Sequence, residues 1–393
     1  MDLDYKSNLW KIYSFKFLSS LQFFSAVLIP FFTEWGKISF TQVMILQSWF
    51  MICIFFLEIP TGAVADYLGR KYSLILAAVM GAIGCVVYVS SPNFYIFLLG
   101  EFILAISVAL MSGADEAFVY DTLKKIKQEN ISKKVFGRIE SFSLAGFLVG
   151  ALSGSLIASK FGLTTPMLLS AIPAIFAMFI GLTLKEPKTT KRIESRRYWD
   201  IIKSGTKFLY QHKILRILTI DAVLISAMAY LILWLYQPML IQAKVKIEYF
   251  GVVQAAFVIC EILILNNFNK LQRIFGSKKR FITFSAVIVG LMFILGGIIN
   301  LVPIIIFAII IAGGFGLTRG TFFSSHLNKY IPSEKRATVL SSISMLRRFS
   351  IAIISPIVGV MVDWSLNYTL IIMGIVTLII TFLSKVKEEH LIE

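Results

Sequence analysis

Long apolar runs recur from one end of this chain to the other, and they constrain its fold more than any other feature. A helix needs about 20 predominantly apolar residues to cross the hydrocarbon core of a bilayer. The 393 residues are 57% apolar and only 15% charged, whereas a soluble domain needs more polar surface. The runs predict an all-α membrane protein with twelve transmembrane helices, near residues 12–32, 41–65, 73–90, 94–120, 136–159, 165–184, 214–236, 249–265, 281–299, 303–323, 337–361 and 368–384.

The net charge of +16 is distributed unevenly between the two sides of these predicted helices. With the N-terminus inside, the outer loops hold only four of the 38 basic residues, namely Lys37, Lys160, Lys244 and Lys246. An excess of Lys and Arg in cytoplasmic loops is the positive-inside pattern of membrane proteins. The charge therefore predicts a multi-pass protein of the cell membrane with both termini in the cytoplasm, and it gives no reason to expect nucleic acid as a partner.

A basic polar segment divides the predicted spans into two groups of six. We expect an N-terminal six-helix bundle over residues 1–184, a cytoplasmic linker over 185–213 and a C-terminal six-helix bundle over 214–393. Within the linker, apolar and basic residues alternate in a way typical of an amphipathic helix, which we expect to lie on the inner membrane surface.

One polar loop between the second and third spans carries a specific motif, made by Gly62, Asp66, Gly69, Arg70 and Lys71. The glycines allow close helix approach and a tight turn. The acid suits a helix N-terminus, and the arginine can pair with a carboxylate. A plain turn that obeys the positive-inside rule is the alternative interpretation.

The spacing of these five residues resembles the signature loop of the major facilitator superfamily. The resemblance implies two related six-helix bundles that work by alternating access, with the substrate site between them at mid-membrane. It also implies a gating role for this loop, with the arginine paired to an acid at the inner end of span 4. Asp121 is the best match for that acid and Asp115 is the second. Residues 268–279 form a faded copy of the loop that keeps Gly276 and the basic cluster.

Glycines in span 5 give a second signal. Gly146, Gly150 and Gly154 lie on one helix face, where they permit close helix packing. Their spacing resembles the glycine pattern of the drug/proton antiporter branch, although Ala151 and Ser155 depart from that pattern. Helix packing without any bearing on transport direction is the alternative.

Acidic residues within apolar spans are candidates for proton coupling, because a charge inside the bilayer is costly unless it has a function or a partner. Glu101 and Asp115 share one face of span 4 at ~100° per residue, while Asp121 points nearly opposite. Glu58 and Glu261 are further candidates. A structural ion pair is the alternative for each acid.

Polar and basic residues in the spans suggest where a substrate binds. Arg347 and Arg348 lie about ten residues into span 11 and could hold an anionic group or neutralise Glu58 or Glu261. Arg319 is expected at the membrane interface. The other candidate substrate-binding residues are Gln22, Ser25, Asp221 and Tyr230.

The leading functional hypothesis is proton-coupled export of a small lipophilic or cationic compound by a monomeric transporter. The alternatives are uptake or facilitated movement of a metabolite or organic anion and, in another class, a lipid flippase or a non-transporting membrane sensor. The expected partners are the substrate, protons and the lipid bilayer. No nucleophile–base set, phosphate loop or metal-ligand spacing is present in the sequence, so we expect no enzyme activity, cofactor or metal.

Overall fold

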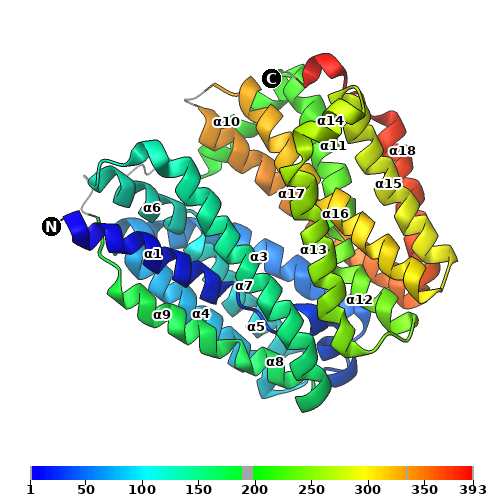
Figure 1. Cartoon of the computed structure of the whole chain (residues 1–393), viewed down its shortest axis with the longest axis horizontal. Helices are drawn as coiled ribbons and strands as arrows, with labels where there is room; N and C mark the ends of the chain where they lie inside the picture. The colour runs from blue at the N-terminus through cyan, green and yellow to red at the C-terminus, as the bar shows by residue number, and fades with distance from the viewer. Residues whose placement is uncertain (1, 188–197, 333–334, 392–393) are drawn as a thin grey trace. The chain divides into compact units, whose positions relative to one another are not determined.

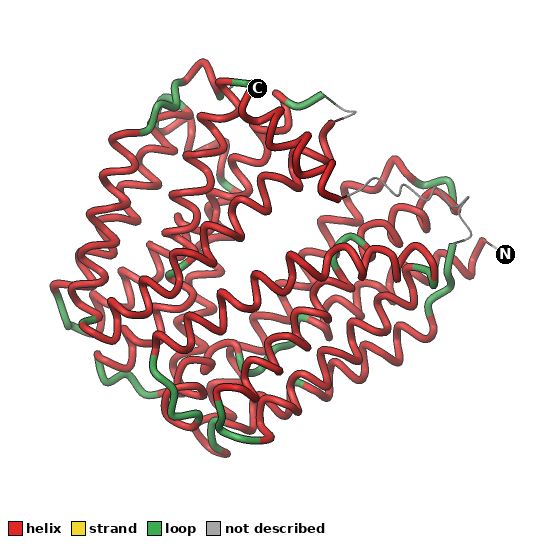
Figure 2. Tube along the Cα trace, turned by 180° about the vertical axis from the view of Figure 1, so that it is seen from behind, coloured by secondary structure: helices red, strands yellow, loops and turns green. Residues whose placement is uncertain are grey.

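The computed structural model describes residues 2–187, 198–332 and 335–391, and most of this chain is helical (Figures 1 and 2). Among the described residues, 11 helices are long and apolar enough to cross a membrane. The first predicted span is interrupted, because α1 (Asp2–Ser19) ends early and short helical pieces continue the chain to Trp35. With this interrupted segment, the helices agree with the twelve predicted spans.

The chain forms two compact units. The first comprises Met1–Ser195 together with Ile247–Gly251, and the second comprises Arg196–Lys246 together with Val252–Glu393. The longer helices of the first unit after α1 are α3 (Phe40–Tyr67), α4 (Arg70–Ser90), α5 (Phe94–Met111), α6 (Ala114–Lys125), α7 (Ser132–Phe161), α8 (Thr164–Leu169) and α9 (Ala171–Thr183), and the short ones are η1 (Ser25–Val27), α2 (Leu28–Pro30), η2 (Phe31–Trp35) and η3 (Glu129–Ile131).

The second unit is also built from helices. They are α10 (Tyr198–Gln211), α11 (Lys213–Tyr230), α12 (Ile232–Gln242), α13 (Phe250–Asn266), α14 (Phe268–Ile274), α15 (Lys278–Ile298), α16 (Val302–Leu327), η5 (Asn328–Tyr330), α17 (Arg336–Trp364), α18 (Leu366–Leu383) and η7 (Glu388–His390). The start of α13 and the preceding η4 (Ile247–Tyr249) group with the first unit.

Polar side chains at the loop ends explain where several helices begin. Ser39 and Gln42 form a capping box at the start of α3. Asn93, Ser277 and Ser365 accept backbone N–H groups at the starts of α5, α15 and α18. Such caps satisfy donors that have no partner within the helix, so the turn residues of the sequence fix these boundaries.

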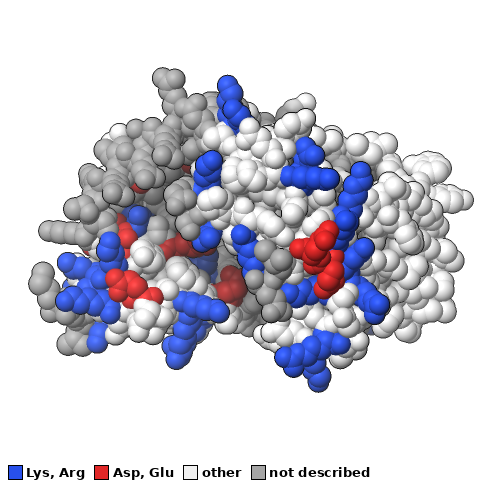
Figure 3. All heavy atoms as spheres, turned by 90° about the horizontal axis from the view of Figure 1, so that it is seen from above, with Lys and Arg blue, Asp and Glu red and all other residues white. Residues whose placement is uncertain are grey.

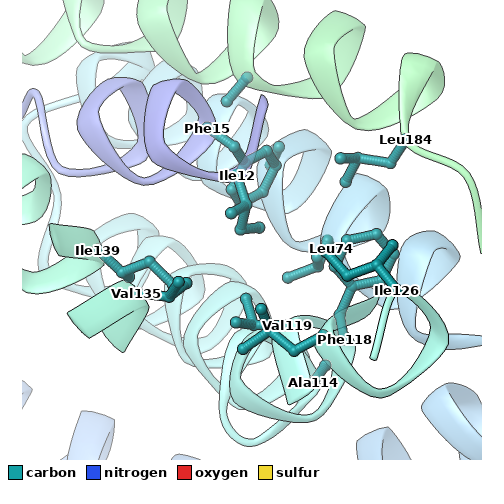
Figure 4. Packing of buried hydrophobic residues seen from close by; sticks show 13 residues of the cluster. Ile12, Phe15, Leu74, Ala114, Phe118, Val119, Ile126, Val135, Ile139 and Leu184 are labelled. Carbon is teal, nitrogen blue, oxygen red and sulfur yellow. The ribbon is translucent and has the colours of Figure 1, made fainter. Parts of the chain in front are cut away.

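The first unit has an apolar core that is shared by α1, α4, α6, α7 and α9. Figure 4 shows Phe15 from α1 and Leu74 from α4 in this cluster, with Phe118 from α6 and Ile139 from α7. Phe15, Leu74 and Phe118 are fully buried. Burying a side chain of this size contributes about 1.5–3 kcal/mol relative to leaving it exposed in water. The core therefore holds the helices that carry the charged groups described below.

The amphipathic helix of the linker, α10, packs within the second unit. Its Phe208 and Leu209 are buried in an apolar cluster of that unit. A Cβ built on Gly205 would lie 2.1 Å from Ser342 Oγ of α17, so the two helices cross very closely. Phe208 and Leu209 therefore pack against protein, and the position of this helix on the inner membrane surface stays a prediction.

In the view of Figure 3, many basic side chains are visible with fewer acidic side chains among them. This is the charge pattern that the positive-inside rule predicts of a cytoplasmic face. The orientation of the termini stays a prediction.

Candidate functional site

The signature loop joins α3 to α4 through a turn that needs glycine. Gly69 has a φ of 108°, and α4 begins at the next residue. A residue with a Cβ would be strained at this φ, so the backbone conformation itself accounts for the glycine. Gly62 differs from the expectation of close helix approach, since a Cβ built there meets no described atom within 4 Å.

The loop's arginine pairs with the acid that the family resemblance implied. Arg70 forms an ion pair with Asp121 of α6, and its Nη1 donates a hydrogen bond to the carbonyl of Ala117 (2.7 Å). Lys71 Nζ donates to the carbonyl of Leu182 (2.8 Å). Asp66 lies exposed in the last turn of α3. The loop is therefore tied to α6 and α9 within its own unit.

Glu186, which was not predicted from the sequence, also binds the signature loop. Its carboxylate accepts the backbone N–H of Arg70 (3.0 Å) and that of Lys71 (2.7 Å), at the start of α4. An anion at a helix N-terminus satisfies free N–H groups and compensates the helix dipole. The only available signal was an acid placed directly after span 6, and nothing in its spacing connected it to residue 70.

The second unit repeats this arrangement. Glu388 accepts the backbone N–H of Lys278 (3.0 Å) and that of Lys279 (2.8 Å), at the start of α15. Gly276, in the turn before that helix, has a φ of 72°. Slight burial acts to raise the pKa of Glu388, but the hydrogen bonds from Lys279 and Lys278 outweigh it and hold the pKa below its ordinary value of 4.5. The matching hydrogen bonds of Glu186 and Glu388 support the interpretation of residues 268–279 as a partial copy of the signature loop.

Span 4 breaks in the middle, which changes the predicted positions of its acids. Gly113 adopts a left-handed conformation (φ 75°) between α5 and α6. The prediction that Glu101 and Asp115 share one helix face is wrong, because it assumed an unbroken helix. Asp115 instead forms an ion pair with Lys16 of α1 at 2.8 Å, and both side chains are 16% exposed.

Glu101 lies in a buried polar cluster in the first unit. The carboxyl is hydrogen-bonded by Gln47 Nε2 at 2.9 Å and by the side chain of Tyr88. Glu101, Gln47 and Tyr88 are 4%, 5% and 2% exposed. Phe97 and Phe32 pack beside the Tyr88 ring. Among the described residues Glu101 has no ion pair, so its polar neighbours are neutral donors.

Asp221 and Arg319 form a buried ion pair in the second unit. Arg319 Nη2 lies 2.9 Å from Asp221 Oδ1, and the two side chains are 2% and 5% exposed. Arg319 Nη1 also donates to the Ile282 carbonyl (2.8 Å) and to Ser285 Oγ (2.7 Å). Ser384 donates to the other oxygen of Asp221. The prediction that Arg319 is interfacial is wrong, since this partner lets the arginine be buried among α11, α15, α16 and α18.

Arg347 lines a hollow of about 640 Å³ in the second unit, formed by α11, α16 and α17. Arg347 is the one charged residue in this lining, and Phe323 is the one aromatic residue. Hydroxyl and amide side chains also contribute to the lining, namely Ser226, Thr321, Ser324, Ser325, Asn328 and Ser344. Asp221 and Tyr230 do not line this hollow, and neither does Arg348.

The interruption of the first span packs against the glycine face of α7. A Cβ on Gly150 would lie 2.8 Å from the backbone N of Gln22, and one on Gly154 would lie 1.7 Å from the carbonyl of Phe23. A Cβ on Gly146 would lie 2.3 Å from the carbonyl of Phe17. These glycines therefore have the predicted packing role. Gln22 and Ser25, the candidate substrate residues beside them, are half-buried.

The remaining candidate acids lie on long helices. Glu58 is half-buried in α3, two residues before Pro60, and Glu261 is half-buried in α13. Arg348 is half-buried in α17, whereas Arg347 is exposed to the hollow. Proton coupling by Glu58 or Glu261 stays a prediction.

The fold of this chain is similar to that of several solved structures. The nucleoside transporter NupG superposes with a TM-score of 0.80 at 16% identity, covering 96% of this chain and 99% of that one. A D-xylose-proton symporter gives a TM-score of 0.72 at 14% identity, covering 99% of each chain. The family model of the Major Facilitator Superfamily matches residues 14–355, and the chain belongs to this family. It is a multi-pass membrane protein of this superfamily.

Curated relatives match shorter stretches of the chain. The D-xylose-proton symporter-like 2 of Arabidopsis thaliana is 27% identical over 150 residues, which is 38% of this chain and 29% of the relative. The glucose/galactose transporter of Brucella abortus is 23% identical over 203 residues, 48% of each protein. The chain thus spans less than half the length of these relatives. Neither is named as a drug antiporter, so membership of that branch stays a prediction.

Proposed function

We propose that this protein carries a small polar metabolite across the cell membrane by alternating access. The observation that supports this most strongly is the hollow of the second unit, where six hydroxyl or amide side chains and one arginine line the wall. Ligand sites typically measure about 300–1,000 Å³ and use a few polar groups to orient the ligand. The hollow has that size and offers many hydrogen-bonding groups for a hydrophilic ligand.

The named relatives are compatible with such a substrate. Their names refer to xylose, to glucose and galactose, and to niacin or nicotinamide, and a similar structure belongs to a nucleoside transporter. These are small molecules rich in hydroxyl, amide or carboxylate groups. We therefore rank polar metabolites above other substrates.

Export of a lipophilic cation is the competing proposal, and it was the leading hypothesis from the sequence. The glycine face of α7 supports it through its resemblance to the antiporter pattern. The hollow supports it less, because its described lining has no carboxylate to neutralise a cation and only one aromatic ring for stacking. The glycines are also accounted for by their close contact with the first span.

Coupling to protons is proposed to use Glu101. An ionised carboxylate is expensive to bury without a positive partner, whereas a neutral carboxyl can share hydrogen bonds with an amide and a phenol. Gln47 and Tyr88 supply those two groups around Glu101. Asp115 is a weaker candidate than before, because Lys16 already neutralises it.

The signature loop is proposed to act as the inner gate. Arg70 and Asp121 are paired, and Asp66 is exposed beside them, so this charge cluster is available to stabilise one state of the transport cycle. The basic side chains seen in Figure 3 support a cell-membrane protein with cytoplasmic termini, and we propose that it acts as a monomer.

Transport by purified protein in liposomes tests the proposal. Labelled glucose, uridine and nicotinate are offered with and without a pH gradient, and labelled tetraphenylphosphonium represents lipophilic cations. We expect faster flux of at least one polar probe than into empty liposomes, and we expect Glu101→Gln to lose the dependence on the gradient. Flux of tetraphenylphosphonium alone would favour the exporter, and absence of any flux would favour a sensor.

A further inference from the structure

We infer that the hollow of the second unit binds the anionic group of its substrate, a carboxylate or a phosphate, through the guanidinium of Arg347. This inference rests on the proposed function, because it names the substrate class for the same hollow. It also distinguishes Arg347, which lines the hollow, from the neighbouring Arg348, which does not.

Arg347 lies beside the like charge of Arg348 and has no carboxylate partner among the described residues. Among the described residues, Arg347 has no ion pair and no hydrogen bond, and its side chain is exposed to the hollow. Its Nη1 lies against α16 at Gly320, where a Cβ would be 3.4 Å from that nitrogen. A membrane-embedded arginine normally faces water, a partner or a pathway. Its guanidinium is therefore available to a ligand.

Two residues that line the same hollow have a buried polar atom without a partner. Ser226 Oγ and Asn328 Oδ1 are buried without a hydrogen-bond partner in the part of the chain that the structure describes. Both residues belong to the lining, one on α11 and the other at the end of α16. Buried polar groups are nearly always satisfied, so these two atoms point to a missing partner. Both residues line the hollow, so rotation of either side chain would bring its oxygen to a ligand seated there.

Arg347 and Asn328 together define the chemistry of the ligand. The guanidinium presents donors in a planar fork that matches the oxygens of a carboxylate or phosphate. The carbonyl oxygen of Asn328 needs a donor, such as a hydroxyl or an N–H group. A neutral sugar would leave Arg347 uncompensated, and a cation would be repelled by it. The best match is a small anion that also carries hydroxyl or amide groups.

Matched pairs of small molecules test this inference by separating charge from shape. The probes are glucose and glucuronate, nicotinamide and nicotinate, and uridine and uridine 5′-monophosphate. Binding is measured by thermal stabilisation of the purified full-length protein in detergent. We expect the anionic member of at least one pair to bind more tightly than its neutral partner. The carboxylate and phosphate members show which anion is preferred.

Variants then assign the effect to one residue. Arg347→Gln should weaken binding of the anion roughly tenfold to hundredfold, the range expected for a lost charge-assisted hydrogen bond. It should leave the neutral partner unaffected. Arg336→Gln, an identical change at the exposed start of α17, is the matched control and should bind like the parent.

Each alternative outcome has a distinct meaning. Equal binding of neutral and anionic partners, or an anion preference that survives Arg347→Gln, would overturn the inference while leaving the proposed polar substrate intact. Absence of binding by every probe would contradict the proposed function as well. A parent-like melting temperature without ligand shows that Arg347→Gln is folded, and Arg347→Lys provides a second variant if it is not.

Discussion

Neutralising Asp221 should destabilise the second unit severely. In Asp221→Asn, the guanidinium of Arg319 stays buried at 2% exposure and loses the carboxylate that lay 2.9 Å away. Its bonds to Ile282 and Ser285 remain, but both of these acceptors are neutral. Removing one partner of a buried ion pair typically costs about 3–5 kcal/mol, because the other charge is left uncompensated. The Coulomb attraction between the two charges does not by itself give this cost, because folding had already removed the hydration of both groups.

The assay is unfolding of the purified protein in mixed micelles, with the denaturing detergent as the variable and helicity as the signal. Glu129→Gln is the matched control, because it removes an equivalent charge from an exposed residue of the first unit and should change stability by less than about 0.5 kcal/mol. The double variant Asp221→Asn with Arg319→Met should recover part of the loss, since it removes the uncompensated charge. A cost for Asp221→Asn no larger than that of Glu129→Gln would refute the reasoning.

Three further predictions follow from the same structure. Gly154→Val should prevent folding or greatly lower the melting temperature, because its Cβ would lie 1.7 Å from the Phe23 carbonyl, whereas Gly137→Val has open space and should fold normally. The depressed pKa of Glu388 means that its carboxylate stabilises the fold above pH 4.5 and that this contribution is lost as pH falls through the folded pKa; Glu388→Gln should remove this part of the acid sensitivity in a melting series. Asp66→Asn should express normally, slow transport and increase labelling of the inner side by thiol reagents, and unchanged transport with unchanged labelling would exclude its gating role.

The sequence predicted the parts of this fold that depend on local patterns. Apolar run length located the membrane helices, and the resemblance to the family's signature loop implied Asp121 as the partner of Arg70. The glycines of span 5 were correctly expected to permit close packing, because absence of a side chain has that meaning on any helix. These features need only helix geometry and the properties of single residues.

Contacts between distant parts of the chain could not be predicted in this way. Glu186 looked like one acid of a polar linker, yet it binds the start of α4, 116 residues away. Arg319 looked interfacial because its partner Asp221 lies 98 residues earlier and only the folded unit brings them together. The break at Gly113 was missed because a single glycine within an apolar run does not show which φ it adopts.

The carboxylate of Glu186 connects two segments of the first unit that lie far apart in the sequence. The segment that follows the sixth span is bound through Glu186 to the first two residues of α4, Arg70 and Lys71. Glu388 anchors the C-terminal tail to α15 in the same manner. Each unit therefore uses an acid that follows its last membrane helix to fix the start of its third, so the two segments stay together for as long as these hydrogen bonds hold.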